Sequence, residues 1–490
     1  MDTVEKIWVD EIASNAFSKL KTLVVEYCEK LSSIFSSNTM LIGFQNLEML
    51  TVTDCGFLEV VFHIQDSNMS GNHSASTFRL RELNLERLPK MKHIWSGHPH
   101  GTLTFECLQC LKAEKCESLR NLFPSPVAKS MTRLENLEVN DCGVEEIIAE
   151  EDEGVGMSVD DLIFPRLMVL ILIELPKLRS FYGNSHTSTW PLLKELMVKH
   201  CNKIRPISFA SEIQSCQDDT TSEDQLALFS FEKRFPNLER LSVVCSSFKE
   251  IFSEDVFGHG GVSLKALGNL QQLQLNILHN LRQVWKDGSL MAQILNQIED
   301  LSIWKCSSLS IVFPSPTSFQ RLTQLIVEDC PGLVHIGTSL AVTSLVHLTN
   351  LILRDCGAME DVVTYGGNRV EEISFPNLRI LALDGLPSLE GFSLANCAFM
   401  FPSLVSIFVK QCPKMNIFCQ GALRTPKLNK VFLSYEDNEG LWEGDLNTTI
   451  QTLLTLTKST LNSLSQPHLA ARSFSGVEDN LDDDNRWPYI

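Results

Sequence analysis

The sequence of 490 residues lacks several features that would place it in common functional classes. Its longest apolar run, residues 167–173, is far shorter than the roughly 20 residues that cross a bilayer, so we expect no membrane span. Basic residues are scarce, at 41 against 60 acidic ones, and they form no Lys/Arg run, which argues against a nucleic-acid partner. The first residues, Met1 to Glu5, have neither the basic nor the apolar segment of a secretory signal, so we expect a cytoplasmic location.

Catalytic and cofactor motifs are also missing. The sequence contains no H-E-x-x-H, G-x-S-x-G or G-x-G-x-x-G, and no Lys-Ser or Lys-Thr pair follows the glycine of a phosphate loop. The spacing of Cys107 and Cys110 suits a metal site, but no second pair lies in register, and Cys110 falls where a strand residue faces outward. We therefore expect no enzyme activity, no cofactor and no metal site.

What the chain has in abundance is one short repeated pattern. Residues 134–148 read LENLEVNDCGVEEII and residues 322–336 read LTQLIVEDCPGLVHI; both fit L-x-x-L-x-(L/V)-x-x-(C/L) with an apolar end. This is the signature of a leucine-rich repeat. Fourteen copies lie about 30 residues apart, and a fifteenth begins at Leu428. The ninth positions of the fourteen copies are Cys28, Cys55, Leu88, Cys116, Cys142, Leu175, Cys201, Ser246, Leu278, Cys306, Cys330, Cys356, Leu386 and Cys412.

The pattern predicts an α/β-type repeat solenoid, a horseshoe with a parallel β-sheet on its concave face and an irregular or short helical convex side. In each copy the first, fourth and sixth residues are expected to point inward, and the third, fifth and seventh to face outward. Nine of the fifteen cysteines occupy the ninth position. We expect these cysteines to be reduced and buried as core filler.

The pattern also divides the chain into three parts. Residues 1–19 match only the end of a repeat, residues 20–440 form the solenoid, and residues 441–490 form a partly disordered tail with a short helix at 448–464. Because the chain opens inside a repeat without an amphipathic cap, we expect it to be a portion of a larger protein, unless a partner covers residues 1–35. Polar stretches, mostly rich in Asp, Glu, Ser and Gly, predict loops projecting at 64–77, 150–161, 210–234, 254–266 and 364–372.

The outward fifth position changes character along the chain. Its early part is polar and is flanked by Glu26, Glu82, Glu86 and Glu114, whereas its late part is apolar. A contiguous apolar strip rimmed by charge is typical of a partner-binding site. The alternatives are that the tail covers this strip, or that its aromatic residues simply pack together. The candidate partner-binding residues are Trp304, Ile326, Ile352, Arg354, Phe408, Lys410 and Phe432.

The variant repeat resembles the leucine-rich-repeat region of plant coiled-coil nucleotide-binding leucine-rich-repeat disease resistance proteins. It shares Phe-Pro-x-Leu openings such as Phe164-Pro165, alternating L-P-x-L and C-x-x-L centres, and Ile-Phe or Ile-Trp ends. Residues 442–450 are similar to the closing motif of that group, so the resemblance covers roughly residues 4–450. It implies a protein ligand, either a pathogen effector or a modified host protein. It also implies an upstream nucleotide-binding domain, in cis or in trans, which the repeats restrain.

The sequence therefore predicts a protein-recognition scaffold with a sensing and autoinhibitory role in plant defence. A substrate-recognition subunit of a ubiquitin ligase is an alternative from another class, but the residues before Leu20 leave no room for an adaptor-binding motif. A non-functional receptor fragment is a further alternative. A secreted receptor ectodomain is opposed by the missing signal peptide and the missing paired-cysteine caps.

Overall fold

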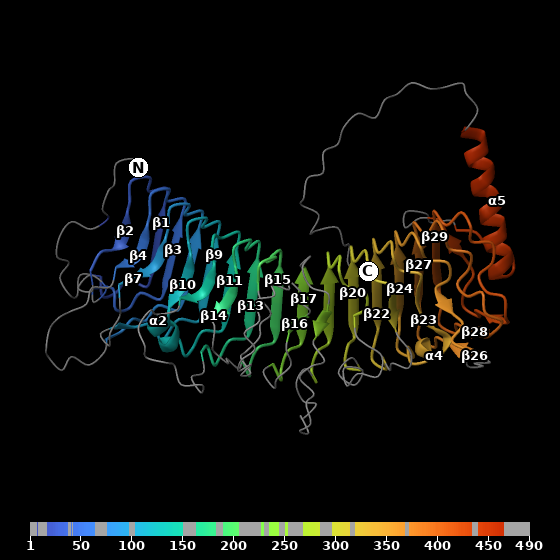
Figure 1. Ribbon diagram of the computed structural model, residues 1–490, viewed down its shortest axis with the longest axis horizontal. Coiled ribbons are helices and arrows are strands. Elements are labelled where there is room, and N and C mark those ends of the chain that lie inside the picture. The colour runs from blue at the N-terminus through green and yellow to red at the C-terminus, as the bar shows by residue number, and fades with distance from the viewer. Residues whose placement is uncertain are drawn as a thin grey trace, which may run out of the picture.

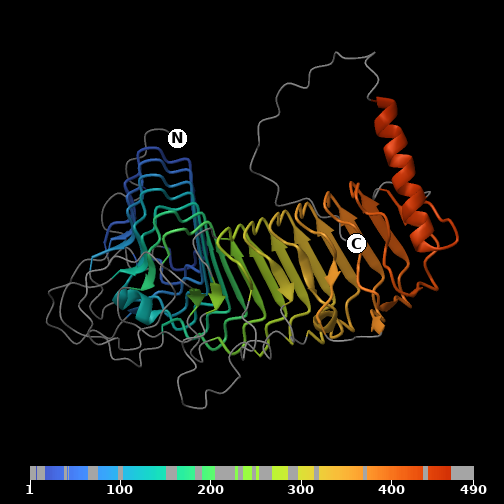
Figure 2. The same ribbon diagram turned by 45° about the vertical axis from the view of Figure 1, so that its right-hand side comes forward.

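The computed structural model is an elongated solenoid in which successive repeats stack along one axis (Figure 1). Figure 2 shows the N-terminal coils stacked upon one another, with a helix at the opposite end. No helix among the described residues has the length and apolar content that crossing a membrane requires. The described residues are 7, 17–37, 41, 43–63, 76–97, 103–149, 163–182, 190–204, 227–229, 235–244, 250–252, 268–284, 296–313, 319–367, 372–433 and 440–464.

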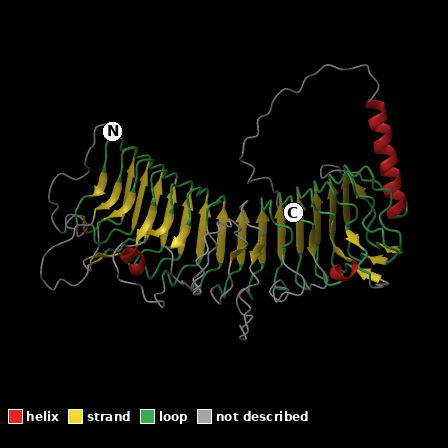
Figure 3. Cartoon of the chain, viewed as in Figure 1, coloured by secondary structure: helices red, strands yellow, loops and turns green. Residues whose placement is uncertain are grey.

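The concave face is a parallel sheet of fifteen strands that pair strictly in sequence order, as predicted from the fourteen copies and the partial fifteenth (Figure 3). The strands are β1 (Thr22–Glu26), β3 (Met49–Thr53), β6 (Glu82–Glu86), β9 (Cys110–Glu114), β11 (Asn136–Asn140), β13 (Val169–Ile173), β15 (Glu195–Lys199), β17 (Arg240–Val244), β19 (Gln272–Asn276), β20 (Asp300–Trp304), β22 (Gln324–Glu328), β24 (Asn350–Arg354), β27 (Ile380–Asp384), β29 (Ser406–Lys410) and β31 (Val431–Phe432).

The register of this sheet places each repeat position in a straight column. Leu137 at the fourth position pairs with Leu111 on one side and Leu170 on the other, and all three are fully buried. Most of these strands alternate buried and half-buried residues, because consecutive side chains of a strand point to opposite faces. Neighbouring coils therefore bury each other's leucines, which no single coil can do alone.

The convex side, predicted to be irregular or short helical, also contains short parallel strands, formed by the apolar ends of many repeats and by residues that directly precede several repeat openings. The strand at a repeat end arises where the (I/V)-(F/W) pair stacks on the same pair of the next coil, as Phe35 does on Phe62. The short strands are β2 (Ser33–Phe35), β4 (Val60–His63), β5 (Ser76–Thr77), β7 (His93–Ser96), β8 (Leu103–Thr104), β10 (Asn121–Pro124), β12 (Glu146–Ala149), β14 (Ser180–Tyr182), β16 (Ala227–Phe229), β18 (Glu250–Phe252), β21 (Ile311–Phe313), β23 (His335–Thr338), β25 (Val363–Thr364), β26 (Glu372–Ser374), β28 (Ala398–Met400) and β30 (Leu423–Arg424).

Two short helices on the convex side lie entirely within the described residues, α2 (Ser125–Ser130) and α4 (Ser339–Val342). Ser130 links α2 to the start of the same repeat. Its hydroxyl donates to the carbonyl of Val127 within the helix at 2.8 Å and accepts from the N–H of Phe105 at 3.4 Å. The helix therefore satisfies polar backbone groups that the coil would otherwise leave unpaired.

A row of left-handed residues follows the concave strands at the eighth position. Among the described residues, twelve non-glycine residues there have φ between 49° and 55°, and Gly385 has φ 66°. These residues turn the chain out of the sheet, and most of them still donate their N–H to the next strand, as Asp141 does to the carbonyl of Ile173 at 3.0 Å. Asn, Asp and Gly tolerate this region well, whereas the β-branched Ile277 at φ 55° is strained.

The C-terminal end of the solenoid is capped by the chain that follows the last coil. Helix α5 (Leu446–Leu464) confirms the helix predicted at 448–464, begins two residues earlier, and buries Leu446, Ile450 and Leu453 against the core (Figure 1). The side chain of Asn447 accepts from the N–H groups of Phe418 and Cys419 and donates to the carbonyl of Cys419. These contacts replace the backbone partners that a further coil would supply.

The predicted projecting loops fall mostly outside the described residues. The stretches 150–161 and 254–266 lie outside them entirely, as does the tail after residue 464. Parts of the other stretches are regular structure, since β5 closes 64–77, β16 lies within 210–234 and β26 begins at the end of 364–372.

One buried carboxyl on the convex side makes stability depend on pH. Asp361 is 8% exposed, and burial raises its pKa to about 6 despite a hydrogen bond to Thr364. Because the folded pKa exceeds the ordinary value of 3.8, the ionised form is disfavoured in the folded chain. The contribution of Asp361 to stability is therefore greatest below about pH 4 and is lost as the pH rises through about 6.

We expect Asp361→Asn to raise the free energy of unfolding at neutral pH by about 1 kcal/mol, because the amide carries no charge to desolvate. Denaturant unfolding measured at neutral pH and near pH 4 tests this expectation. The gain should shrink at the acid pH, where the native carboxyl is already protonated. An equal effect at both pH values would contradict the assignment.

Candidate functional site

The concave face presents the third, fifth and seventh residues of each coil in straight columns. Four of the predicted binding residues, Ile326, Ile352, Phe408 and Phe432, fall in the fifth column on β22, β24, β29 and β31. Ala382 on β27 completes this column, pairing with Ile352 on one side and Phe408 on the other. These five residues form an unbroken apolar strip, which we call the apolar strip.

The apolar strip is partly accessible rather than sealed. Its four large side chains are half-buried, whereas Ala382 is fully covered by its taller neighbours. The rings of Phe408 and Phe432 stack with their centroids 5.3 Å apart and an interplanar angle of 26°. The expected packing of aromatics on each other therefore holds for this pair, and the stack still leaves both rings half-buried on the concave face.

The other three predicted residues lie in the seventh column, beside the strip. Trp304 on β20 pairs in register with Glu328, and its ring lies 4.5 Å from the ammonium nitrogen of Lys305. The column then continues through Arg354 and ends at Lys410. The structure thus brings all seven predicted residues to one face, as two adjacent columns.

Charges alternate along the seventh column in a set that we call the charged row: Glu328, Arg354, Asp384 and Lys410. These residues occupy successive strands and are paired in register. Arg354 Nη1 lies 3.8 Å from Glu328 Oε2, and Lys410 Nζ lies 3.5 Å from Asp384 Oδ2. Opposite charges facing each other across strands stabilise the sheet modestly and fix the orientation of the side chains.

Carboxylates crowd together just past the charged row. Burial raises the pKa of Asp355, and the nearby carboxylates of Asp384 and Asp329 raise it further. Burial likewise raises the pKa of Glu328, partly offset by Arg354. The carboxylates at the rim of the apolar strip therefore repel one another.

A second apolar patch on the concave face was not singled out from the sequence. All three outward residues of β13, Val169, Ile171 and Ile173, are apolar and half-buried, and Met197 on β15 pairs in register with Ile171. The signal was available, because residues 167–173 are the longest apolar run, and a strand in such a run must expose apolar side chains.

The N-terminal part of the face is less acidic than its glutamates suggested. Lys112 on β9 lies 3.0 Å from Glu138 and 3.8 Å from Glu114, and Arg87 contacts Glu86. These cations neutralise much of the charge that the sequence places there.

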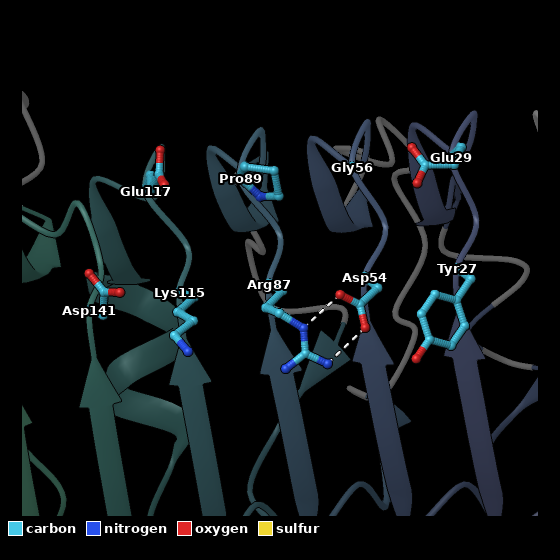
Figure 4. Close-up of a pocket in the computed structure, with 9 residues that line it drawn as sticks. All are labelled: Tyr27, Glu29, Asp54, Gly56, Arg87, Pro89, Lys115, Glu117 and Asp141. Carbon is cyan, nitrogen blue, oxygen red and sulfur yellow. Dashed lines mark hydrogen bonds and ion pairs between the residues drawn. The ribbon is translucent and has the colours of Figure 1, made fainter. Parts of the chain in front are cut away.

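A hollow of about 480 Å³ lies at the edge of this N-terminal region (Figure 4). At its centre Arg87 donates to both carboxylate oxygens of Asp54, at 2.6 and 2.7 Å. Its walls come from the eighth and tenth positions of successive repeats, which supply charged groups of both signs. The lining residues are Tyr27, Glu29, Asp54, Gly56, Arg87, Pro89, Lys115, Glu117 and Asp141.

The cysteines at the ninth position are buried and pack in the core. At the ninth position Cys142 donates from its thiol to the carbonyls of Asn140 at 3.2 Å and Ala113 at 3.6 Å, linking two coils. Burial raises the pKa of Cys356 and Cys412 to about 12, which keeps these thiols protonated. Cys110 is half-buried on the concave face, as predicted. In the described ranges no three His, Cys, Asp or Glu side chains are placed to hold a metal ion.

The family model and the similar sequences both point to plant disease resistance proteins. The family model described as plant disease resistance protein RPS2-like, leucine-rich repeats, matches residues 1–143, 212–317 and 314–422. Two Arabidopsis thaliana proteins named as disease resistance proteins, At4g10780 and At4g27220, are similar to parts of the chain. The first is 25% identical over 169 residues, which is 31% of this chain and 19% of its own length. The second is 29% identical over 104 residues, 21% of this chain and 11% of its own.

The match spans less than a fifth of the length of either relative. Among solved structures, the pneumococcal vaccine antigen PcpA aligns over 84% of this chain and 80% of its own, at 10% identity and a TM-score of 0.20. A likeness at that level carries no argument about this chain.

Proposed function

This chain belongs to the RPS2-like leucine-rich-repeat family of plant disease resistance proteins, and from that premise we propose that it is a protein-recognition surface acting in a defence response. Repeats of this kind bind proteins through the extended concave surface that their stacking creates. We place the contact on the apolar strip together with Trp304, Arg354 and Lys410. The unit that carries it would be residues 20–440, closed by the cap that includes Asn447.

The observation that supports this proposal most directly is the continuity of the apolar strip. Ile326, Ile352, Phe408 and Phe432 are held in register across five strands, half-buried, and bordered by the charged row. Partner sites typically combine an apolar centre, enriched in aromatic residues, with a polar rim. Large aromatic side chains on a rigid sheet also lose little conformational freedom on binding, which favours affinity.

We propose that the ligand is a pathogen effector or a modified host protein, met in the cytoplasm. The repeats would restrain a nucleotide-binding domain, in cis or in trans, and release it when the ligand binds. A ligand shifts such an equilibrium only by the difference between its affinities for the two states. The concave face would therefore have to contact the ligand and the restrained domain differently.

The double substitution Phe408→Asp and Phe432→Asp tests the site. In plant cells expressing the full chain fused to a proximity-labelling enzyme, we expect the variant to label the wild-type partners at least tenfold less, because aromatic anchors dominate such contacts. The matched control is Gln274→Asp with Ser302→Asp, which places the same charges in the polar middle of the same column.

Circular dichroism should show that both double variants keep the wild-type fold, since all four side chains face outward. Partners labelled equally by the wild type and by the Phe408/Phe432 variant would rule out the apolar strip as the contact. Loss of labelling in both double variants would indicate a contact that is not confined to the strip.

A further inference from the structure

The rim of the apolar strip carries more negative charge than its own cations balance. Within the charged row each carboxylate is matched by a base, since Glu328 lies opposite Arg354 and Asp384 lies opposite Lys410. The next position of two repeats adds Asp329 and Asp355. Neither aspartate makes an ion pair within the part of the chain that the structure describes. Between β22 and β29 the rim thus holds four carboxylates against two cations.

The carboxylates are held close to one another by the backbone. Asp329 and Asp355 occupy equivalent left-handed positions after β22 and β24, at φ 51° and 49°. Glycine at position 385 provides the room, because a Cβ there would lie 2.1 Å from Asp355 Oδ1. The carboxylate of Asp355 therefore lies against Gly385, next to Asp384.

The repulsion among these groups has an electrostatic signature. The pKa of Asp355 is raised by burial and then by Asp384 and Asp329, and Arg354 and Lys410 offset this only in part. The pKa of Glu328 is raised by burial and by the aspartates Asp355, Asp329 and Asp384 as well. A cationic group placed on this rim would relieve a repulsion that the sheet leaves in place.

We infer that the segment docking on the apolar strip presents bulky apolar side chains beside cationic ones, an inference that rests on the proposed function. The apolar groups would cover Ile352, Phe408 and Phe432, and a Lys or Arg side chain would lie over Asp329 and Asp355. The cations of the face are already engaged: Arg354 and Lys410 are ion-paired, and Lys305 lies over the ring of Trp304. An anionic segment would therefore have to compete with the protein's own carboxylates.

The spacing of the two columns defines the segment further. The fifth and seventh positions are two residues apart along a strand, which corresponds to about 7 Å. Alternate residues of an extended segment on one side have the same separation. The net charge of −19 would also speed the approach of a cationic partner at low ionic strength.

Two synthetic peptides serve as probes of this inference. They have equal length and the same Leu and Trp residues, and the residue two positions after each of these is Lys in one peptide and Glu in the other, so that both kinds of side chain lie on one side of an extended chain. Binding to the full chain is measured by fluorescence anisotropy at two salt concentrations. We expect the Lys peptide to bind at least tenfold more tightly than the Glu peptide, and this preference to shrink at high salt.

Variants then locate the charge effect. Asp329→Asn with Asp355→Asn should weaken the Lys peptide about tenfold, because two partly exposed charge contacts are removed. Asparagine tolerates the left-handed backbone, so the fold is kept. The control is Asp141→Asn, the same repeat position at φ 50° on the far part of the sheet, which should leave binding unchanged. Phe408→Ser with Phe432→Ser removes the apolar contact without adding charge.

The outcomes separate this inference from the proposed function. Equal binding of both peptides, lost in the Phe408/Phe432 variant, would uphold the strip as a docking site and refute the cationic requirement. A Lys preference that persists in the Asp329/Asp355 variant would show that the charge acts elsewhere and would also refute it. If the wild-type chain does not bind the Lys peptide, the inference is wrong.

Discussion

Phe62→Ala is expected to lower the free energy of unfolding of the N-terminal coils by about 4 kcal/mol, because it empties the space of a large buried ring. Phe62 is fully buried, and its ring stacks on Phe35 at 5.4 Å and on Trp95 at 5.9 Å. It also meets Phe78 and Phe105 edge to face, at 6.1 and 5.2 Å. Removing it leaves a cavity between coils that stacked rings on both sides cannot easily close.

The measurement must follow individual coils, since a repeat array can lose part of its structure without unfolding entirely. Hydrogen exchange in increasing denaturant provides this, with the effect expected in β3, β4 and β6. The control is Phe57→Ala in the same repeat. Phe57 is 52% exposed and contacts the ammonium of Lys90, 3.3 Å from its ring centroid, so its loss should cost less than about 1 kcal/mol. Equal effects of the two substitutions would contradict the buried aromatic core.

Gly143→Ala is expected to destabilise the chain by about 3 kcal/mol through overpacking. A Cβ at this position would lie 1.9 Å from the carbonyl oxygen of Glu117 in the preceding coil, a backbone atom that cannot turn aside as the end of a flexible side chain can. The coils on either side would have to separate locally. Thermal and denaturant unfolding should both show the loss, with the change concentrated around β9 and β11.

Gly357→Ala is the matched control for this steric effect. Both glycines follow a ninth-position cysteine, Cys142 or Cys356, yet a Cβ at Gly357 meets no atom within 4 Å. We expect this substitution to be neutral or to stabilise the chain by about 0.5 kcal/mol, because alanine restricts the unfolded chain more than glycine does. If both substitutions cost the same, the close approach at Gly143 would be refuted.

The repeat pattern was sufficient to place every concave strand in order, because an apolar residue at a fixed position is buried by the apolar residue at the same position of the next coil. The same reasoning located the apolar strip, since Phe408 and Phe432 occupy outward positions in neighbouring strands. It also assigned the cysteines to the core, where Cys142 and its equivalents are buried. These are consequences of period and alternation, which a single chain displays in full.

Other features depend on what lies beside a residue in the neighbouring coil. The sequence shows the apolar run that contains Ile171. That this run forms part of a larger apolar patch follows only from the structure, in which Met197 of the next strand pairs with Ile171. The early glutamates predict an acidic surface, but Lys112 and Arg87 form ion pairs with glutamates there and neutralise part of the charge. The sequence after residue 440 predicts a helix but does not show that this segment caps the solenoid. The capping role follows from the contacts of Asn447 with the last coil.

The amino-acid sequence alone determined the solenoid, its repeat positions and the family to which it belongs, because each coil repeats one local pattern of buried and exposed side chains. The tertiary structure decided which carboxylates crowd around Asp355, which glycine lies too close to a neighbouring backbone to carry a side chain, and how the C-terminal end is closed. Those depend on distances between atoms of different coils. Repeats that look alike in sequence, such as those of Gly143 and Gly357, differ there by the path of the adjacent backbone.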